Sequence, residues 1–225
     1  MDIDFRRSVC RGCTIRVMDE LMQEIAACAA RLVVEEGLEY GAAKRRAVKS
    51  MRLTQRAALP NNDLVEQHVF EYLEMFCAET QPQELLALRR HALQWMGRLQ
   101  AFRPYLSGAV WRGTATRLSD IYLQLFCDDP KSTEIALINM NLSYDVTTVQ
   151  GFQGEAVDAL SLHSMCPGLE EDIGIHLMIY DHDDVRGALK PDEKGRSVRG
   201  DWSALKKLIE DGCEHEDSRR YESKR

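Results

Sequence analysis

Apolar side chains in the first hundred residues recur with the period of an α-helix. The first apolar stripe follows steps of three and four residues and consists of Val17, Leu21, Ile25, Cys28 and Leu32. This spacing places the side chains on one helix face. A stretch rich in Ala, Lys and Arg predicts a short helix over about 40–51. Similar stripes predict helices after the turn at 59–63 and from Pro82 to about Gln100, with Pro82 at a helix start. The pattern predicts a helical N-terminal region over residues 1–100.

The pattern changes to short apolar runs after Pro104. These runs and their turn residues predict β-strands over Tyr105–Val110, Ser119–Phe126, Ala156–His163 and Ile173–Tyr180. Helices are predicted to begin at Pro130 and to span Trp202–Ile209. We therefore expect an α+β fold, in which a helical N-terminal half is followed by a mixed β-sheet flanked by helices over residues 101–211. The charged tail, 212–225, is predicted to be disordered.

The composition narrows the class of protein. The 225 residues are 44% hydrophobic and 29% charged, which excludes wholesale disorder. The formal net charge of -7 disfavours nucleic acid as a partner, because general nucleic-acid binders carry a basic stripe. No apolar run approaches the roughly 18 residues of a membrane span, so no membrane partner is expected. The seven cysteines are scattered and odd in number, which predicts a reducing cytoplasmic location.

One segment combines glycines, an arginine and an aspartate at suggestive spacing. From Gly108 to Leu123 it reads Gly-Ala-Val-Trp-Arg-Gly-Thr-Ala-Thr-Arg-Leu-Ser-Asp-Ile-Tyr-Leu. It resembles the signature of the minimal nucleotidyltransferases of the DNA polymerase β-like superfamily, which runs Gly-Ser-x-Ala-Arg-Gly and later Ser-Asp-hydrophobic-Asp-hydrophobic. The positions that match are Gly108, Arg112, Gly113, Ser119, Asp120, Ile121 and Leu123. The resemblance covers about sixteen residues directly.

The resemblance implies a nucleotidyltransferase-like sheet and transfer of a nucleoside monophosphate from an NTP to a protein or nucleic-acid hydroxyl. The implied nucleotide-binding residues are Gly108, Arg112, Gly113 and Ser119. A glycine here lets a phosphate approach the main chain. Two carboxylates at i and i+2 on the following strand point to one face, where they share Mg²⁺ ions. Asp120 is the first of these carboxylates.

The sequence departs from this signature twice. Ala109 replaces the serine, and Tyr122 replaces the second carboxylate. A phenol stays protonated near pH 7 and is a poor Mg²⁺ ligand. Asp158, on a predicted strand, is the candidate third carboxylate, so Asp120 and Asp158 are the expected catalytic and metal-binding pair.

Three interpretations stay open at this point. The first is a Mg²⁺-dependent nucleotidyltransferase that uses an NTP and modifies a protein acceptor or, less in keeping with the net charge, a nucleic acid. The second is a catalytically degenerate member that binds a nucleotide or a protein partner. The third is a plain hairpin loop with Ser119 and Asp120 as turn residues.

Overall fold

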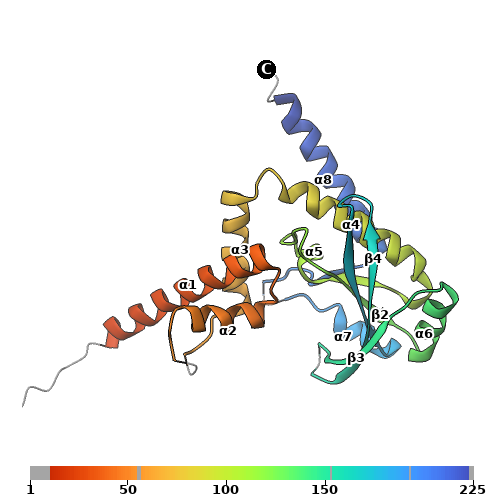
Figure 1. Cartoon of the computed structure of the whole chain (residues 1–225), viewed down its shortest axis with the longest axis horizontal. Helices are drawn as coiled ribbons and strands as arrows, with labels where there is room; N and C mark the ends of the chain where they lie inside the picture. Colours follow the sequence, from red (N-terminus) through yellow and green to blue (C-terminus); the bar gives the residue numbers. More distant parts are fainter. Residues whose placement is uncertain (1–10, 55–56, 153, 193, 223–225) are drawn as a thin grey trace, which may run out of the picture. The chain divides into compact units, whose positions relative to one another are not determined.

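The computed structural model describes residues 11–54, 57–152, 154–192 and 194–222 (Figure 1). The chain forms two compact units that divide between Ala78 and Glu79. In the described part of the chain, no helix is both long enough and apolar enough to cross a membrane. Each unit has its own hydrophobic core.

The first unit consists of three helices, α1 (Arg11–Glu36), α2 (Tyr40–Ser50) and α3 (Asn62–Phe76). Of the stripe predicted on α1, Ile25 and Leu32 are buried in this core, and Leu21 and Cys28 pack against it. The side chain of Val17 lies outside the described residues. The turn before α3 acts as predicted, because the Asn61 side chain accepts a hydrogen bond from the Leu64 main-chain N–H at 2.8 Å. The helical character of this region is confirmed.

The second unit is built on a six-stranded sheet. Its strands are β1 (Tyr105–Ser107), β2 (Ile121–Phe126), β3 (Asp145–Gln150), β4 (Ala156–Cys166), β5 (Glu171–Tyr180) and β6 (Arg199–Gly200). They lie in the order β3-β4-β5-β2-β1-β6. Neighbouring strands are antiparallel except β2 and β5, which are parallel. The expected α+β class with a mixed sheet is confirmed.

The second unit also contains helices. They are α4 (Gln81–Arg98), α5 (Gly108–Arg112), α6 (Pro130–Asn139), α7 (Val185–Ala188) and α8 (Trp202–Glu222), with 3-10 turns η1 (Gln100–Phe102) and η2 (His182–Asp184). Gly108 begins α5 and does not end a strand as expected. The tail predicted to be disordered is helical as far as Glu222, and residues 223–225 lie outside the described residues.

One face of the sheet, the covered face, is buried beneath α4. Leu123 of β2 and Ile175 and Leu177 of β5 point to this face and are fully buried. They pack in one core with Leu88 and Trp95 of α4. The Trp95 Nε1–H also donates to Ser164 Oγ of β4 at 3.2 Å. Because α4 belongs to this core, the boundary between the units lies before it, whereas the sequence placed that boundary at residue 100.

The opposite face, the open face, is apolar at one end and polar at the other. Phe126, Val157 and Tyr180 form a small core with Ala188 of α7 at the apolar end. The polar end begins at His176, four residues before Tyr180 on β5. It also holds Asp120, and the side chains of Asp120 and His176 are 46% and 27% exposed. Within the central strands β2 and β5, the partly exposed polar side chains of the open face therefore lie at this end.

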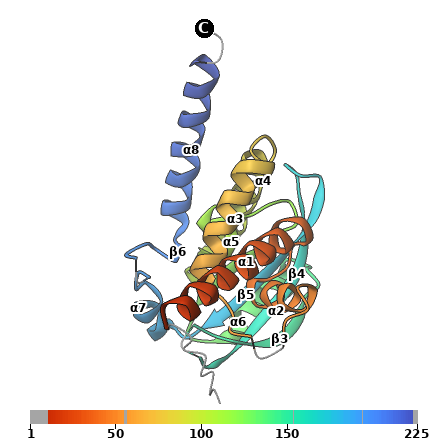
Figure 2. The same cartoon turned by 90° about the vertical axis from the view of Figure 1, so that its left-hand side faces the viewer.

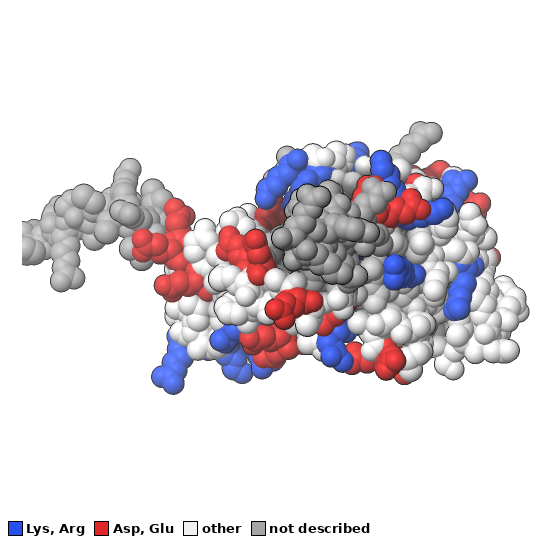
Figure 3. All heavy atoms as spheres, turned by 90° about the horizontal axis from the view of Figure 1, so that it is seen from above, with Lys and Arg blue, Asp and Glu red and all other residues white. Residues whose placement is uncertain are grey.

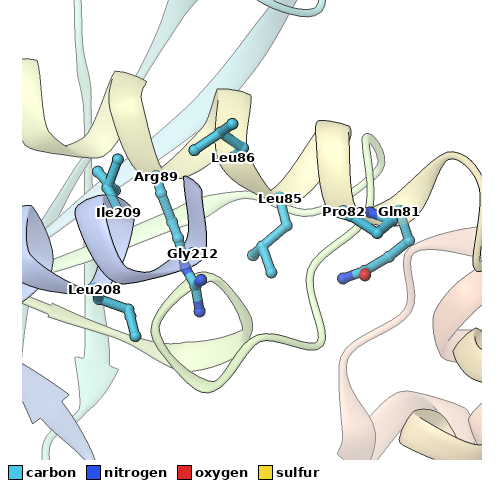
Figure 4. A pocket seen from close by; sticks show the side chains of 8 residues that line it. All are labelled: Gln81, Pro82, Leu85, Leu86, Arg89, Leu208, Ile209 and Gly212. Atoms are coloured by element: carbon cyan, nitrogen blue, oxygen red, sulfur yellow. The ribbon is translucent and has the colours of Figure 1, made fainter. Parts of the chain in front are cut away.

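Helices α4 and α8 pack together, and α8 then extends beyond α4 (Figures 1 and 2). Between them lies an apolar groove of about 180 Å³, lined by Gln81, Pro82, Leu85, Leu86, Arg89, Leu208, Ile209 and Gly212 (Figure 4). Arg89 is half-buried here, and this desolvation lowers its pKa to about 10. Its guanidinium therefore stays charged near neutral pH.

Two glycines test the packing of the second unit. A Cβ on Gly200 of β6 would overlap the Trp111 ring, which is held by a 2.9 Å hydrogen bond from its Nε1–H to the Ser197 carbonyl. We expect Gly200→Ala to lower the free energy of unfolding by about 1–3 kcal/mol through overpacking. Urea denaturation followed by tryptophan fluorescence measures this, since all three tryptophans lie in the second unit.

The matched control is Gly212→Ala in α8. Its Cβ would meet no atom within 4 Å, so it should raise the free energy of unfolding by about 0.5–1 kcal/mol through helix propensity. Equal effects of the two substitutions would contradict the close Gly200–Trp111 packing.

Candidate functional site

The segment between β1 and β2 is held in place by side chains of α4. The Gln81 Nε2–H donates to the carbonyls of Gly113 and Ala115 at 3.1 and 2.9 Å, and the Arg89 Nε–H donates to the Val110 carbonyl at 3.1 Å. These carbonyls belong to α5 and the turn after it, and the last carbonyls of a helix have no N–H donor within the helix. Helix α4 thus fixes both the covered face and the loop that carries the signature.

Gly108 and Gly113 both adopt backbone angles that favour glycine. Their φ values are +72° and +92°, in the left-handed region. Gly108 lies against the Tyr122 ring, because a Cβ at this position would be 3.5 Å from Tyr122 Cδ2. The signature glycine is therefore adjacent to the side chain that replaces the second carboxylate.

The strand register brings Asp120, Tyr122, His176 and Ser161 to one face. Tyr122 of β2 lies opposite His176 of β5, and His176 lies opposite Ser161 of β4. Asp120 precedes β2 and is two residues from Tyr122, so it lies on the same side. These four residues, the polar cluster, form the polar end of the open face.

A chain of hydrogen bonds connects three members of the polar cluster. His176 Nε2 lies 3.2 Å from Asp120 Oδ2, and His176 Nδ1 lies 2.9 Å from Ser161 Oγ. In a neutral imidazole, one nitrogen donates and the other accepts. With the proton on Nε2, His176 donates to the Asp120 carboxylate and accepts from the Ser161 hydroxyl. The arrangement can hold a proton between a carboxylate and a hydroxyl.

The pKa of Asp120 is lowered from its ordinary value, chiefly because His176 donates a hydrogen bond to the carboxylate. Partial burial opposes this effect, and the charge of His176 and a main-chain hydrogen bond from Gly174 add to it. Gly174 also makes room for the carboxylate, since a Cβ there would lie 2.5 Å from Asp120 Oδ1. Asp120 is therefore ionised and partnered at neutral pH.

The rings of Tyr122 and His176 stack, with centroids 4.8 Å apart and planes inclined by 25°. In the signature, position 122 would carry a second carboxylate on the same face as Asp120. Here the position carries a phenol that packs against an imidazole. The geometry therefore places two aromatic rings where a metal-bridging acid is expected.

Asp158 is not brought to Asp120. It lies on β4 three residues from Ser161, and an odd separation along a strand reverses the face. It therefore points to the covered side of the sheet, opposite Ile179 and two strands away from β2. The strand containing Asp158 was predicted, but its register could not be. Asp120 and Asp158 do not form the expected metal-binding pair.

The other predicted nucleotide-binding residues are spread along the loop. Ser119 Oγ accepts a 3.0 Å hydrogen bond from the Thr116 main-chain N–H, so it closes the turn before β2. Arg112 ends α5 and is partly buried, and Gly113 caps that helix. Gly108 lies against the Tyr122 ring and so contacts the polar cluster.

The residues at this face do not fit a carboxylate-bridged pair of Mg²⁺ ions. Mg²⁺ prefers oxygen ligands, with carboxylates as the usual protein donors. The polar cluster offers one carboxylate, Asp120, and among the described residues no group of three His, Cys, Asp or Glu side chains could hold a metal ion. The chemistry that this chain's own residues supply is hydrogen bonding and proton holding.

On the face drawn in Figure 3, acidic and basic side chains of the described residues are interspersed. Lys and Arg side chains on the face in Figure 3 do not gather into a continuous basic stripe among the residues described there. This distribution agrees with the net charge of -7. It offers no extended track for a nucleic-acid backbone on that face.

Sequence reasoning missed His176, Ser161 and Gly174. Each lies on a strand that was predicted, yet none belongs to a recognisable motif. Their proximity to Asp120 depends on β2 lying parallel to β5 and β5 antiparallel to β4. The single polar side chain of His176 within an apolar strand is the one sequence signal that could have indicated an exposed face.

Comparisons with known proteins do not assign this chain to a family. No family model and no curated protein matches the chain. A crystal structure of the Cid1 poly(U) polymerase with MgGTP bound aligns with a TM-score of 0.35 and 13% identity, over 51% of this chain and 38% of that one. The alignment thus spans less than half of that protein's length. A likeness at this level carries no argument about function.

The Asp120–His176 hydrogen bond predicts a pH effect. Because the pKa of Asp120 is lowered in the folded state, the bond stabilises the fold above the ordinary value of 3.8. This stabilisation is lost as the pH falls below that value and through the folded-state pKa. We expect His176→Gln to raise the pKa of Asp120, measured by NMR titration of its carboxyl carbon.

His163→Gln is the control. His163 acts on Asp120 only through a weaker charge effect, so this substitution should change the pKa much less. An Asp120 pKa that is the same in the wild type and in His176→Gln would show that the bond is absent in solution.

Proposed function

We propose that this chain is a nucleotidyltransferase-like module that binds a nucleoside triphosphate without catalysing metal-dependent transfer. The observation that carries the proposal is the polar cluster, in which Tyr122 and His176 stack beside a single carboxylate, Asp120. In-line transfer by two metal ions needs bridging carboxylates that both point to the metals. One carboxylate that already accepts a hydrogen bond from His176 is a poor substitute.

The proposed phosphate-binding element is the β1–α5 junction. Gly108 leaves the main chain of this junction without a side chain beside the Tyr122 ring, which lets a phosphate approach the main chain. Arg112 supplies a cation at the end of the same short helix. The free energy of phosphate binding would come from these groups and would not require a protein-bound Mg²⁺ ion.

The state of Asp120 supports binding without a metal. A free carboxylate beside a triphosphate would repel it, whereas the His176 Nε2 partly offsets that charge at 3.2 Å. The Tyr122 ring, stacked on His176 and next to Gly108, adds an apolar surface beside the junction. These contacts favour a degenerate binding site over a Mg²⁺-dependent transferase.

Nucleotide binding should therefore be insensitive to Mg²⁺. We expect ATP, GTP, CTP or UTP to raise the melting temperature of the chain equally with Mg²⁺ and with EDTA. Arg112→Ala should weaken the affinity about tenfold, the usual effect of losing one charge-assisted contact to phosphate. Isothermal titration calorimetry with each nucleotide measures both effects.

Arg45→Ala in α2 provides a charge-matched control that should leave the affinity unchanged. Binding that requires Mg²⁺ and is lost in Asp120→Asn would favour the transferase. No binding of any nucleotide would rule out a nucleotide site and leave a protein-interaction module.

Position 122 offers a direct test of the lost metal site. Tyr122→Asp places a second carboxylate on the face of Asp120 at i+2. We expect it to destabilise the fold by about 1 kcal/mol through lost stacking and like-charge repulsion. Mg²⁺ at millimolar concentration should recover part of the melting temperature in this variant but not in the wild type.

The control is Tyr122→Asn, which removes the same ring without adding a charge. A Mg²⁺-dependent rise in melting temperature that is equal in both variants, or already present in the wild type, would contradict the account of position 122.

A further inference from the structure

Strand β3 is a sheet edge with one neighbour. It pairs with β4 over six residues and is the outermost strand in the sheet order (Figure 1). In the part of the chain that the structure describes, no other strand pairs with it. The main-chain N–H and C=O groups of every second residue therefore point away from the sheet, where a further strand can bond to them.

The β3 edge lacks the features that usually prevent strand pairing. Its sequence, Asp-Val-Thr-Thr-Val-Gln from Asp145 to Gln150, contains no lysine and no proline, and four of its residues are β-branched. Its register with β4 is continuous, so no bulge interrupts the strand. Val146 is 56% exposed. Natural sheet edges are commonly protected by charge, proline or a bulge.

The opposite edge of the sheet is different. Strand β6 has only two residues, Arg199 and Gly200, and both are buried. A short, buried edge offers few groups to a partner. Strand pairing is therefore expected at β3 alone of the two edges.

We propose that β3 pairs with β3 of a second copy of this chain, which would join two sheets into one of twelve strands. A two-fold axis perpendicular to the sheet makes the strands antiparallel and keeps each face continuous. The axis passes through a residue, because directly opposed residues share a face. Axes through Thr147 and through Thr148 both satisfy this condition.

Both registers are complementary in side chains. With the axis at Thr147, Val146 lies opposite Thr148 and Asp145 lies opposite Val149. With the axis at Thr148, Thr147 lies opposite Val149 and Val146 lies opposite Gln150. Neither register opposes two acidic groups, and pairs of β-branched residues stabilise antiparallel strands.

The charge on neighbouring strands permits the pairing. Asp158 of β4 is paired with Thr148, so its counterpart in an axis-148 dimer lies about 14 Å away, three strand spacings, beyond the Debye length of about 8 Å. Strand β3 itself carries a single charge, Asp145, and neither register places it opposite another acid. A charged peptide would find no opposite charges along this strand, whereas a second copy pairs with it without like-charge repulsion, so the second copy is the favoured partner. This inference is independent of nucleotide binding.

Sedimentation velocity tests the proposal. An interface of one strand pair is small, so we expect a monomer–dimer equilibrium between about 5 and 500 µM. Thr147→Lys should raise the dimer dissociation constant at least tenfold, because it puts a charge at the centre of the β3 edge. Thr147→Val keeps a β-branched, uncharged side chain and should remain dimeric.

Circular dichroism and the melting temperature should show that both variants are folded at low concentration. Hydrogen exchange gives a second measurement, in which the amides of 145–150 should exchange more slowly at high than at low concentration in the wild type and not in Thr147→Lys. A wild-type monomer throughout the series, or a dimer unaffected by Thr147→Lys, would overturn the proposal.

Discussion

The packing of α4 against the covered face is the constraint on which the second unit depends. Leu88 and Trp95 bury one side of the sheet, so the strands have a fixed inside and outside. The same helix reaches the carbonyls around α5 through Gln81 and Arg89. A buried guanidinium is costly to desolvate, and its hydrogen bonds to carbonyls offset that cost. The position of Gly108 relative to β2 thus follows from the core.

The sequence was a good guide wherever a local period decides the structure. The helical stripe at Ile25 and Leu32, the cap at Asn61 and the apolar runs of β4 and β5 all predicted their elements, because burial leaves a repeat of 3.6 or 2 in the chain. Strand β3 was missed because both of its sides are exposed and it shows no alternation. The tail after 211 was expected to be disordered from its charge, whereas its charged residues are also good helix formers.

The site was less predictable because it depends on register. The motif marks the segment from Gly108 to Asp120, and Tyr122 is its departure from the signature. A functional role of these residues stays a prediction. The choice of Asp158 failed since a one-residue shift in strand pairing moves a side chain to the other face. His176 carried no motif at all, and its place beside Asp120 follows only from the parallel pairing of β2 with β5. A local sequence pattern does not indicate which distant strands pair with each other.

Contacts within the polar cluster satisfy its one carboxylate without a second acidic residue. Tyr122 stacks on His176, His176 bonds Asp120, and Gly174 leaves space for that carboxylate. The hydrogen bond from His176 gives the negative charge of Asp120 a partner at this face. A site of this kind repels a phosphate less than an empty pair of carboxylates does. A partnered Asp120 and a glycine at the β1–α5 junction are therefore compatible with the nucleotide binding that we propose.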